Sequence, residues 1–424
     1  MEVSGCRQIE AILREEMLTA LGCTEPIAIA YAAAKAREAL GAVPEKMLVE
    51  CSGNLIKNAK AVTVPMTVDL KGIEAAALVG AIGGDPSREL EVLTTVTEED
   101  LVLAKKLLAE NVCEVRHLKT PAKLHIIVSC SKGEDSALVE ILHNHNYIVR
   151  IEKNGEVIYQ IPHDLTDPGD LGTDRSILTL DNIVDYCRTA DYSAVKDLLD
   201  REIECNMAIA KEGLSHDWGE SVGKTLIEMY GDSVAVKARA GAAAGSDARM
   251  NGCEMPVVIN SGSGNQGITV SVPVITYARA LGKSEDELCR ALLCSNLVGI
   301  MQKYKVGRLS AYCGAVSAGT SAVCGIAFLQ GGDAEMLGRI ITNTLAAIGG
   351  AVCDGAKSSC AGKIAATLET ALVGYEMAKK DRYYKPGEGL VKDTYQGTID
   401  AYCKMAKVGM AQTDETILDI MLND

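Results

Sequence analysis

Two segments of this chain, residues 255–278 and 309–332, contain no charged side chain over 24 residues each. A helix of that length could cross a lipid bilayer. Both segments are, however, rich in Gly, Ser, Thr and amide side chains, and ordinary charged sequence flanks them. This composition favours closely packed elements in a protein interior, so we expect no contact with a membrane.

The bulk composition narrows the classes of protein further. A chain of 424 residues is longer than one hydrophobic core usually serves, which indicates two domains. Its content of 48% hydrophobic and 23% charged residues is typical of a compact, soluble protein. A net charge of -15 and 4% aromatic residues provide neither a basic patch nor stacking platforms, so we expect no nucleic-acid partner.

The hydrophobic pattern changes along the chain. After a helix at 98–110, short segments up to residue 165 alternate apolar and polar side chains, which predicts antiparallel strands, and Asn154-Gly155 favours a hairpin turn. From residue 178 the pattern is helical, interrupted by glycine-rich loops. The expected helices near the N-terminus are 7–20, 27–40 and 73–82; the expected strands are 47–51 and 61–65 around a turn SGNLIKNAK, then 112–118, 123–130, 138–143, 147–152 and 156–160; the expected loops are 241–245, 261–267, 313–320 and 349–363.

These elements predict an α+β fold with a large, mainly helical domain and a smaller antiparallel-sheet α/β module. We expect residues 1–85 to pack on the helical domain, residues 86–170 to form the small α+β module, and residues 171–424 to form the helical domain itself. The polar stretch DPGDLGTD that begins at residue 167 is the expected linker between the last two parts.

The stretch LGCTEP places Cys23 just before a helix that has Pro26 in its first turn. Exposed N–H groups and the helix dipole stabilise a thiolate at such a position, which favours a reactive Cys23. Glu25 could accept a proton, or could simply favour the helix start electrostatically. A purely structural thiol explains the residues equally well.

The stretch SGSGNQG at 261–267 contains the spacing G-x-G-x-x-G in Gly262, Gly264 and Gly267, after the strand-like run MPVVIN. Nicotinamide binding is one interpretation, although repeated βαβ units are lacking. A glycine turn for close packing is another. The third is a cradle for a small anion, in which backbone N–H groups are helped by polar side chains. Those side chains are Ser261, Ser263, Asn265 and Gln266.

The chain contains 15 cysteines and no apolar signal segment near its start, so we expect a reducing, cytoplasmic location and no disulfide framework. The cysteine spacings do not match a zinc motif. Cys353 and Cys360 in CDGAKSSC lie among small residues, as does Cys313 in AYCGAVSAG, and Cys294 has the setting of a helix-core thiol. On spacing alone, buried inert thiols and an iron–sulfur site both remain open.

Five stretches in order resemble the L-cysteine desulfidases and the wider serine dehydratase α-chain-like family: LGCTEPIAIAYAAAKARE, SGNLIKNA, NSGSGNQG, YCGAVSAGTSA and CDGAKSSCAGK. The resemblance implies an iron–sulfur-dependent enzyme whose helical domain, residues 171–424, holds a 4Fe-4S cluster through Cys313, Cys353 and Cys360. One iron would then lack a protein ligand and act as a Lewis acid. The reaction it implies is β-elimination without pyridoxal phosphate, from L-cysteine to hydrogen sulfide, pyruvate and ammonia.

The resemblance also implies roles around the substrate. Cys23 occupies the family's GCTEP position and is the expected base for the Cα proton. The expected substrate-binding residues are Glu25, Asn54, Lys57, Ser261, Gly262, Ser263, Gly264, Asn265 and Lys357. Lys357 could equally face the solvent.

Alternatives to this prediction are an L-serine dehydratase of the same mechanism, a non-catalytic amino-acid-binding protein of the same fold, and a nicotinamide enzyme. The expected partner is a small amino-acid substrate, and we also expect a homodimer.

Overall fold

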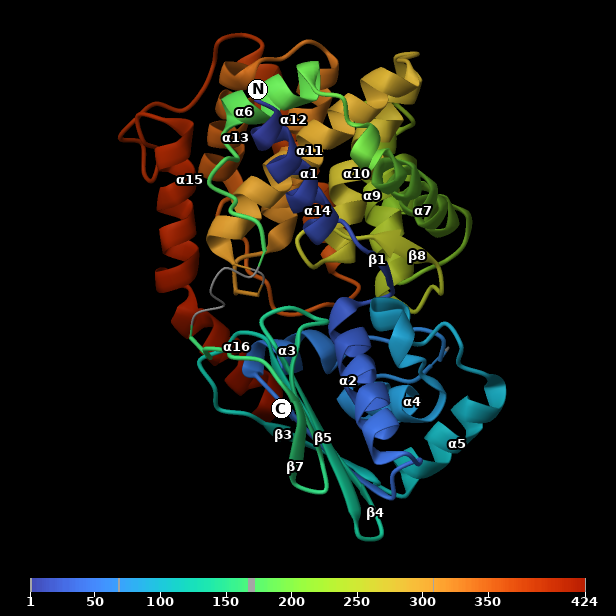
Figure 1. Cartoon of the computed structure of the whole chain (residues 1–424). Coiled ribbons are helices and arrows are strands. Elements are labelled where there is room, and N and C mark those ends of the chain that lie inside the picture. The colour runs from blue at the N-terminus through green and yellow to red at the C-terminus, as the bar shows by residue number, and fades with distance from the viewer. Residues whose placement is uncertain (1, 68, 167–171, 308, 424) are drawn as a thin grey trace.

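The computed structural model describes residues 2–67, 69–166, 172–307 and 309–423. The chain forms a helical half, at the top of Figure 1, and a sheet half, at the bottom. The helical half consists of α1 (Val3–Glu16), α6 (Leu180–Thr189), α7 (Lys196–Ser215), α8 (Val222–Tyr230), α9 (Val234–Met250), α10 (Gly264–Ala280), α11 (Glu285–Val306), α12 (Gly314–Leu329), α13 (Ala334–Ile348), α14 (Cys360–Ala378) and α15 (Tyr395–Lys404). The prediction of an α+β, mostly helical fold is confirmed.

The sheet half is built on six strands in the order β3-β2-β4-β5-β6-β7. Neighbouring strands are antiparallel, as predicted, except that β2 and β3 are parallel. Its strands are β2 (Lys46–Cys51), β3 (Cys113–His117), β4 (His125–Lys132), β5 (Asp135–Leu142), β6 (Ile148–Lys153) and β7 (Glu156–Gln160), and its helices are α2 (Thr24–Leu40), α3 (Gly53–Ala59), α4 (Ile73–Gly83), α5 (Glu98–Ala109) and α16 (Ala411–Asn423).

The first 85 residues are shared between the two halves. Helix α1 lies in the helical half, whereas β2 pairs inside the sheet and α2 packs on α4, β4 and β5. The reason is that α2 is buried along most of its length and that β2 contributes Met47, Val49 and Cys51 to the hydrophobic core of the sheet half. A two-stranded pairing of β1 (Thr19–Leu21) with β8 (Pro256–Val258) links the two halves next to the start of α2.

Several local predictions need correction. The stretch SGNLIKNAK is not a turn, because residues 53–59 form α3, and residues 61–65 form no strand. The glycine-rich stretch 241–245 lies inside α9, and most of 313–320 lies inside α12. Glycine allows α9 to pack closely against α10 there. A Cβ on Gly241 would lie 3.0 Å from Val272, and a Cβ on Gly245 would lie 3.0 Å from Ile268.

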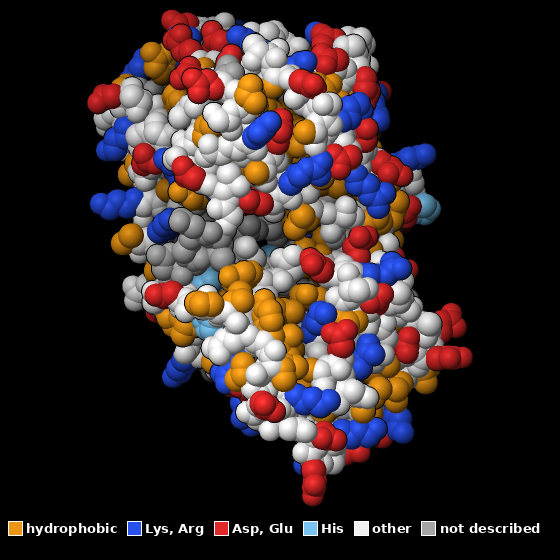
Figure 2. All heavy atoms as spheres, in the orientation of Figure 1, with side chains coloured by type: hydrophobic (Ala, Val, Ile, Leu, Met, Phe, Trp, Pro, Cys, Tyr) orange, Lys and Arg blue, Asp and Glu red, His pale blue; other side chains and the backbone are white. Residues whose placement is uncertain are grey.

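The two uncharged segments lie in the interior, as predicted, since α10 and α12 are buried along most of their lengths. No helix in the described part of the chain is both long enough and apolar enough to span a membrane. On the surface, acidic and basic side chains are interspersed, and hydrophobic side chains gather over part of the sheet half (Figure 2). Edge strand β7 exposes Val157, Ile158 and Tyr159. The homodimer stays a prediction.

Candidate active site

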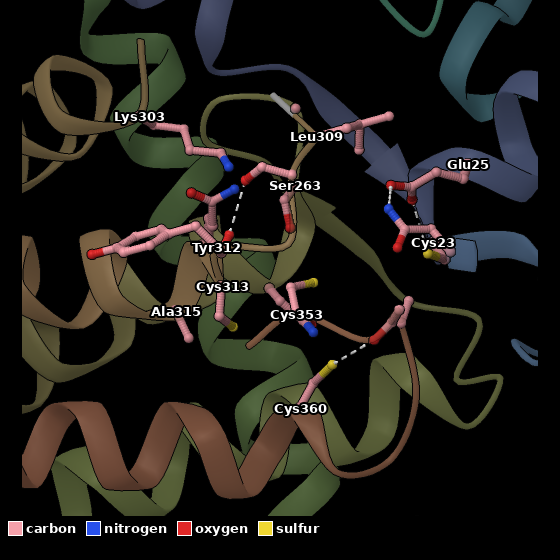
Figure 3. Close-up of a pocket in the computed structure, with 18 of the residues that line it drawn as sticks. Cys23, Glu25, Ser263, Lys303, Leu309, Tyr312, Cys313, Ala315, Cys353 and Cys360 are labelled. Carbon is pink, nitrogen blue, oxygen red and sulfur yellow. Dashed lines mark hydrogen bonds between the residues drawn. The ribbon is translucent and has the colours of Figure 1, made fainter. Parts of the chain in front are cut away.

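A small cavity of about 100 Å³ lies where the start of α2 meets the helical half. Its walls come from segments far apart in the sequence. The lining includes Cys23, Glu25 and Asn58 from the sheet half, and Arg249, Gly262, Ser263, Asn265, Gln266, Lys303, Tyr312, Cys313, Cys353, Gly355 and Cys360 from the helical half. Figure 3 shows the three cysteines of the helical half grouped on one side and Cys23 with Glu25 on another.

Local structure explains how Cys313 and Cys353 meet. The segments around them pair as a short antiparallel bridge, in which the Cys313 N–H donates to the Ala351 carbonyl at 2.9 Å and the Cys353 N–H donates to the Ala311 carbonyl at 2.7 Å. Cys313 is the N-cap residue of α12, and Cys360 is the first residue of α14. Two of the three thiols therefore stand at helix starts, where backbone N–H groups are left without helical partners.

Each of these three sulfur atoms accepts a hydrogen bond from a backbone N–H group. The donors are Ala315 to Cys313, Gly355 to Cys353 and Lys357 to Cys360. Gly355 has φ +101°, and a Cβ there would collide with the Lys57 carbonyl, so the loop 353–360 requires glycine at this position. Backbone N–H donors to sulfur are the environment in which cysteine thiolates hold iron–sulfur clusters.

Cys313 and Cys353 are joined by a hydrogen bond. The hydrogen bond from Cys313 lowers the pKa of Cys353; burial opposes this shift, and the nearby Lys57 ammonium reinforces it. The same hydrogen bond raises the pKa of Cys313, together with burial. All three thiols are free in the structure, so they remain available as ligands.

Lys57 is buried behind the cavity wall. Its Nζ donates to Asp414 Oδ1 at 2.5 Å and to the Cys353 carbonyl at 3.3 Å. The ammonium thus ties α3 to α16 and to the loop that carries Cys353. Lys57 does not line the cavity.

On another side of the cavity, Cys23 is the N-cap residue of α2 and its thiol donates to Glu25 Oε2 at 3.2 Å. Burial and the Glu25 charge raise the pKa of Cys23, so the expected stabilisation of its thiolate by the helix start is outweighed. Burial also opposes ionisation of Glu25, but His145, the Cys23 thiol and Arg249 lower the pKa of this carboxyl. The resting pair is therefore a neutral thiol beside a carboxylate.

The loop 261–263 and the first turn of α10 form a further wall through Gly262, Ser263, Asn265 and Gln266. The Thr24 hydroxyl lies 3.1 Å from both Glu25 Oε2 and the Gly262 carbonyl, which joins this loop to the start of α2. Strand β8 pairs antiparallel with β1, and the cavity is far smaller than a dinucleotide requires, so the nicotinamide interpretation finds no support.

Several predicted substrate-binding residues stand outside the cavity lining. Asn54 lies in the first turn of α3, and Ser261 donates to Asn260 Oδ1 at 2.9 Å and lines a neighbouring cavity. Gly264 is the first residue of α10 and contacts Arg249. Lys357 pairs with Asp354 at 2.5 Å and is partly exposed.

Sequence reasoning missed Asn58, Arg249 and Lys303 of the cavity lining, and also His145, which lies outside the lining but lowers the pKa of Glu25. Asn58 donates to Glu25 Oε1 at 2.9 Å, Arg249 lines the cavity, and His145 acts on the charge of Glu25. Asn58 was within the quoted stretch SGNLIKNA, so its motif was the available signal. Arg249 and His145 stand in no motif, and only the packing of distant segments brings them to Glu25.

Comparisons with known proteins show which family the chain belongs to. Residues 87–419 match the family described as "Serine dehydratase alpha chain". The chain is 55% identical over 412 residues to a UPF0597 protein of Lachnoclostridium phytofermentans, covering 97% of this chain and 98% of that protein. It is 46% identical over 418 residues to a UPF0597 protein of Treponema denticola, covering 97% of each.

The chain therefore belongs to the serine dehydratase α-chain family. Membership of this family suggests a lyase that depends on iron–sulfur chemistry. The names of these two relatives state no activity and no substrate.

Proposed function

We propose that this protein is an iron–sulfur-dependent lyase that eliminates hydrogen sulfide from L-cysteine. Elimination leaves aminoacrylate, which takes up water to give pyruvate and ammonia. One observation carries the proposal: Cys313, Cys353 and Cys360 converge on one buried cavity, and a thiol–carboxylate pair lies on another side of it. The resemblance and the family match support the same reaction class.

The residues present fit a 4Fe-4S cluster. Cys313, Cys353 and Cys360 would hold it, because their three sulfur atoms face one cavity and each accepts a backbone N–H. The buried Lys57 beside Cys353 offsets the negative charge of thiolates there. When bound, the cluster would supply a Lewis-acid iron for the polar groups of the substrate.

Cys23 and Glu25 would together remove the proton from Cα of the substrate. The proton of this pair rests on the Cys23 sulfur, so Cys23 has to pass it to Glu25 Oε2, at 3.2 Å, before the sulfur can accept the Cα proton. Asn58 holds the other oxygen of Glu25 and fixes the carboxylate in place for this transfer. Because Cys23 is 2% exposed, bulk water does not compete for the proton.

L-serine is the second candidate substrate. The family description names serine dehydratase, and L-serine differs from L-cysteine only in carrying oxygen in place of the leaving sulfur. The same residues could then remove the same Cα proton. The cavity volume does not separate the two substrates.

Anaerobic purification and reconstitution with iron and sulfide test the proposal. We expect a brown protein with a broad visible absorption band, which releases sulfide from L-cysteine faster than it releases pyruvate from L-serine. Faster turnover of L-serine than of L-cysteine would identify L-serine as the preferred substrate. A colourless protein that takes up no iron would refute the iron–sulfur assignment.

A further inference from the structure

Arg249, in the last turn of α9, brings a buried positive charge to the cavity wall. The residue is 3% exposed. Its Nη1 donates to Asn265 Oδ1 at 3.2 Å, and its Nε has no hydrogen-bond partner in the described chain. Among the residues that the structure describes, no carboxylate lies within ion-pair distance of this guanidinium. The Glu25 carboxylate, whose pKa this charge lowers, acts on the guanidinium only from beyond that distance. A buried guanidinium with an unused donor is costly, which indicates that the position is kept for an anionic ligand.

The start of α10 lies against Arg249 and offers donors of its own. Its N-cap residue Ser263 makes no side-chain cap, so the N–H groups of the first turn are not satisfied by that side chain. A Cβ on Gly264 would collide with the Arg249 Nε, so glycine is needed there to let the guanidinium lie over the helix start. A guanidinium beside free N–H groups at a helix start suits a carboxylate, which can accept from both.

We propose that Arg249 and the first turn of α10 bind the α-carboxylate of the substrate. The inference rests on the proposed function only in taking the ligand to be a small amino acid. Asn265 orients the guanidinium. Thr24 links the neighbouring Gly262 to Glu25, which is hydrogen-bonded to Cys23, so the Cα of a bound amino acid would lie near the thiol–carboxylate pair. The cavity then selects small amino acids that have a free α-carboxylate.

The test uses a ligand that cannot react. L-alanine has no leaving group at Cβ, and L-alaninamide lacks the carboxylate, so their binding to the reconstituted protein reports on the site alone. Equilibrium dialysis under anaerobic conditions should show that the wild-type protein binds L-alanine at least about tenfold more tightly than L-alaninamide. In Arg249→Gln, we expect L-alanine binding to weaken by about 10- to 100-fold and this preference to disappear.

The matched control is Arg239→Gln. Arg239 is a buried arginine on the same helix, but it pairs with Glu369 and does not line the cavity. The control should keep wild-type binding of L-alanine. Arg249→Lys keeps the charge without the planar fork and should bind L-alanine more weakly than wild type while still preferring it to the amide. This variant keeps the proposal testable if Arg249→Gln fails to fold.

Unchanged binding of L-alanine in both Arg249 variants would overturn the carboxylate site. If these variants also released sulfide from L-cysteine with the wild-type KM, the proposed reaction would be supported and the carboxylate site would be refuted. If Arg249 governs L-alanine binding but no sulfide is released from L-cysteine, the carboxylate site stands and the proposed reaction fails.

Discussion

Two groups of three cysteines occupy the helical half; one group lines the cavity, and the other is buried in the core. In both groups the thiols interact: Cys313 is hydrogen-bonded to Cys353, and Cys187 is hydrogen-bonded to Cys294. The cavity thiols are Cys313, Cys353 and Cys360, and the core thiols are Cys187, Cys294 and Cys324.

The two groups differ in backbone position and in nearby charge. The core thiols are 0% exposed and lie inside α6, α11 and α12, where helical hydrogen bonds already use the backbone N–H groups. Burial raises the pKa of Cys187 and Cys324. The cavity thiols stand at helix starts or in a loop and accept backbone N–H groups, and Cys353 has the Lys57 ammonium nearby. A cysteine's place relative to a helix start, more than its burial, separates a candidate ligand from an inert thiol.

The largest expected effect is the loss of one cavity thiol. Cys313→Ser, Cys353→Ser or Cys360→Ser should each lower iron content and reduce sulfide release by more than about 100-fold, because serine is a poor ligand for the cluster. Iron and sulfide analysis of the reconstituted variants measures the first effect, and anaerobic sulfide release measures the second.

The core thiols provide the matched control. Cys324→Ala removes a buried sulfur from α12, the helix whose start carries Cys313. It should cost about 1–3 kcal/mol of stability through the small cavity that it leaves, yet retain iron and activity. Equal iron loss in Cys324→Ala and Cys313→Ser would erase the distinction between the two groups.

Cys23→Ala is expected to have the next largest effect. Without the sulfur that accepts the Cα proton, kcat should fall by about 10²- to 10⁴-fold, whereas iron content should stay at the wild-type level because Cys23 is not a proposed ligand. Turnover and iron content measured on the same sample separate these roles. Full turnover in this variant would refute Cys23 as the base.

The sequence predicted the fold class, most strands of the sheet and the stretches that meet at the cavity. The prediction failed where glycine can indicate either a loop or a close helix contact: GAAAG at 241–245 was predicted to be a loop but packs inside α9. It also missed Arg249 and His145, because their effect on Glu25 depends on the approach of α9 and the β5–β6 connection to α2. Local patterns record helix starts and turns, whereas the charge around a buried carboxyl depends on contacts between distant segments.

Two buried glutamates extend the contrast between the cavity and the core. His145 and Arg249 lower the pKa of Glu25, although burial opposes the shift. Glu202, on α7, is 0% exposed and accepts from the neutral Asn296 at 3.0 and 3.1 Å. Burial raises the pKa of Glu202 from 4.5 to about 8. The core carboxyl is therefore protonated at neutral pH, and the cavity carboxyl is ionised.

The smallest expected effect is a change in how stability depends on pH, with no change in the reaction. Between pH 4.5 and about 8, the folded chain keeps the proton on Glu202 and the unfolded chain loses it, so the contribution of Glu202 to folding stability falls as pH rises. The expected slope is about 1.4 kcal/mol per pH unit. Glu202→Gln cannot titrate, so the stability of this variant relative to wild type should rise across the same range. Urea unfolding of both proteins at several pH values measures the difference. A difference independent of pH would mean that Glu202 is ionised in the folded protein, and the contrast with Glu25 would then be lost.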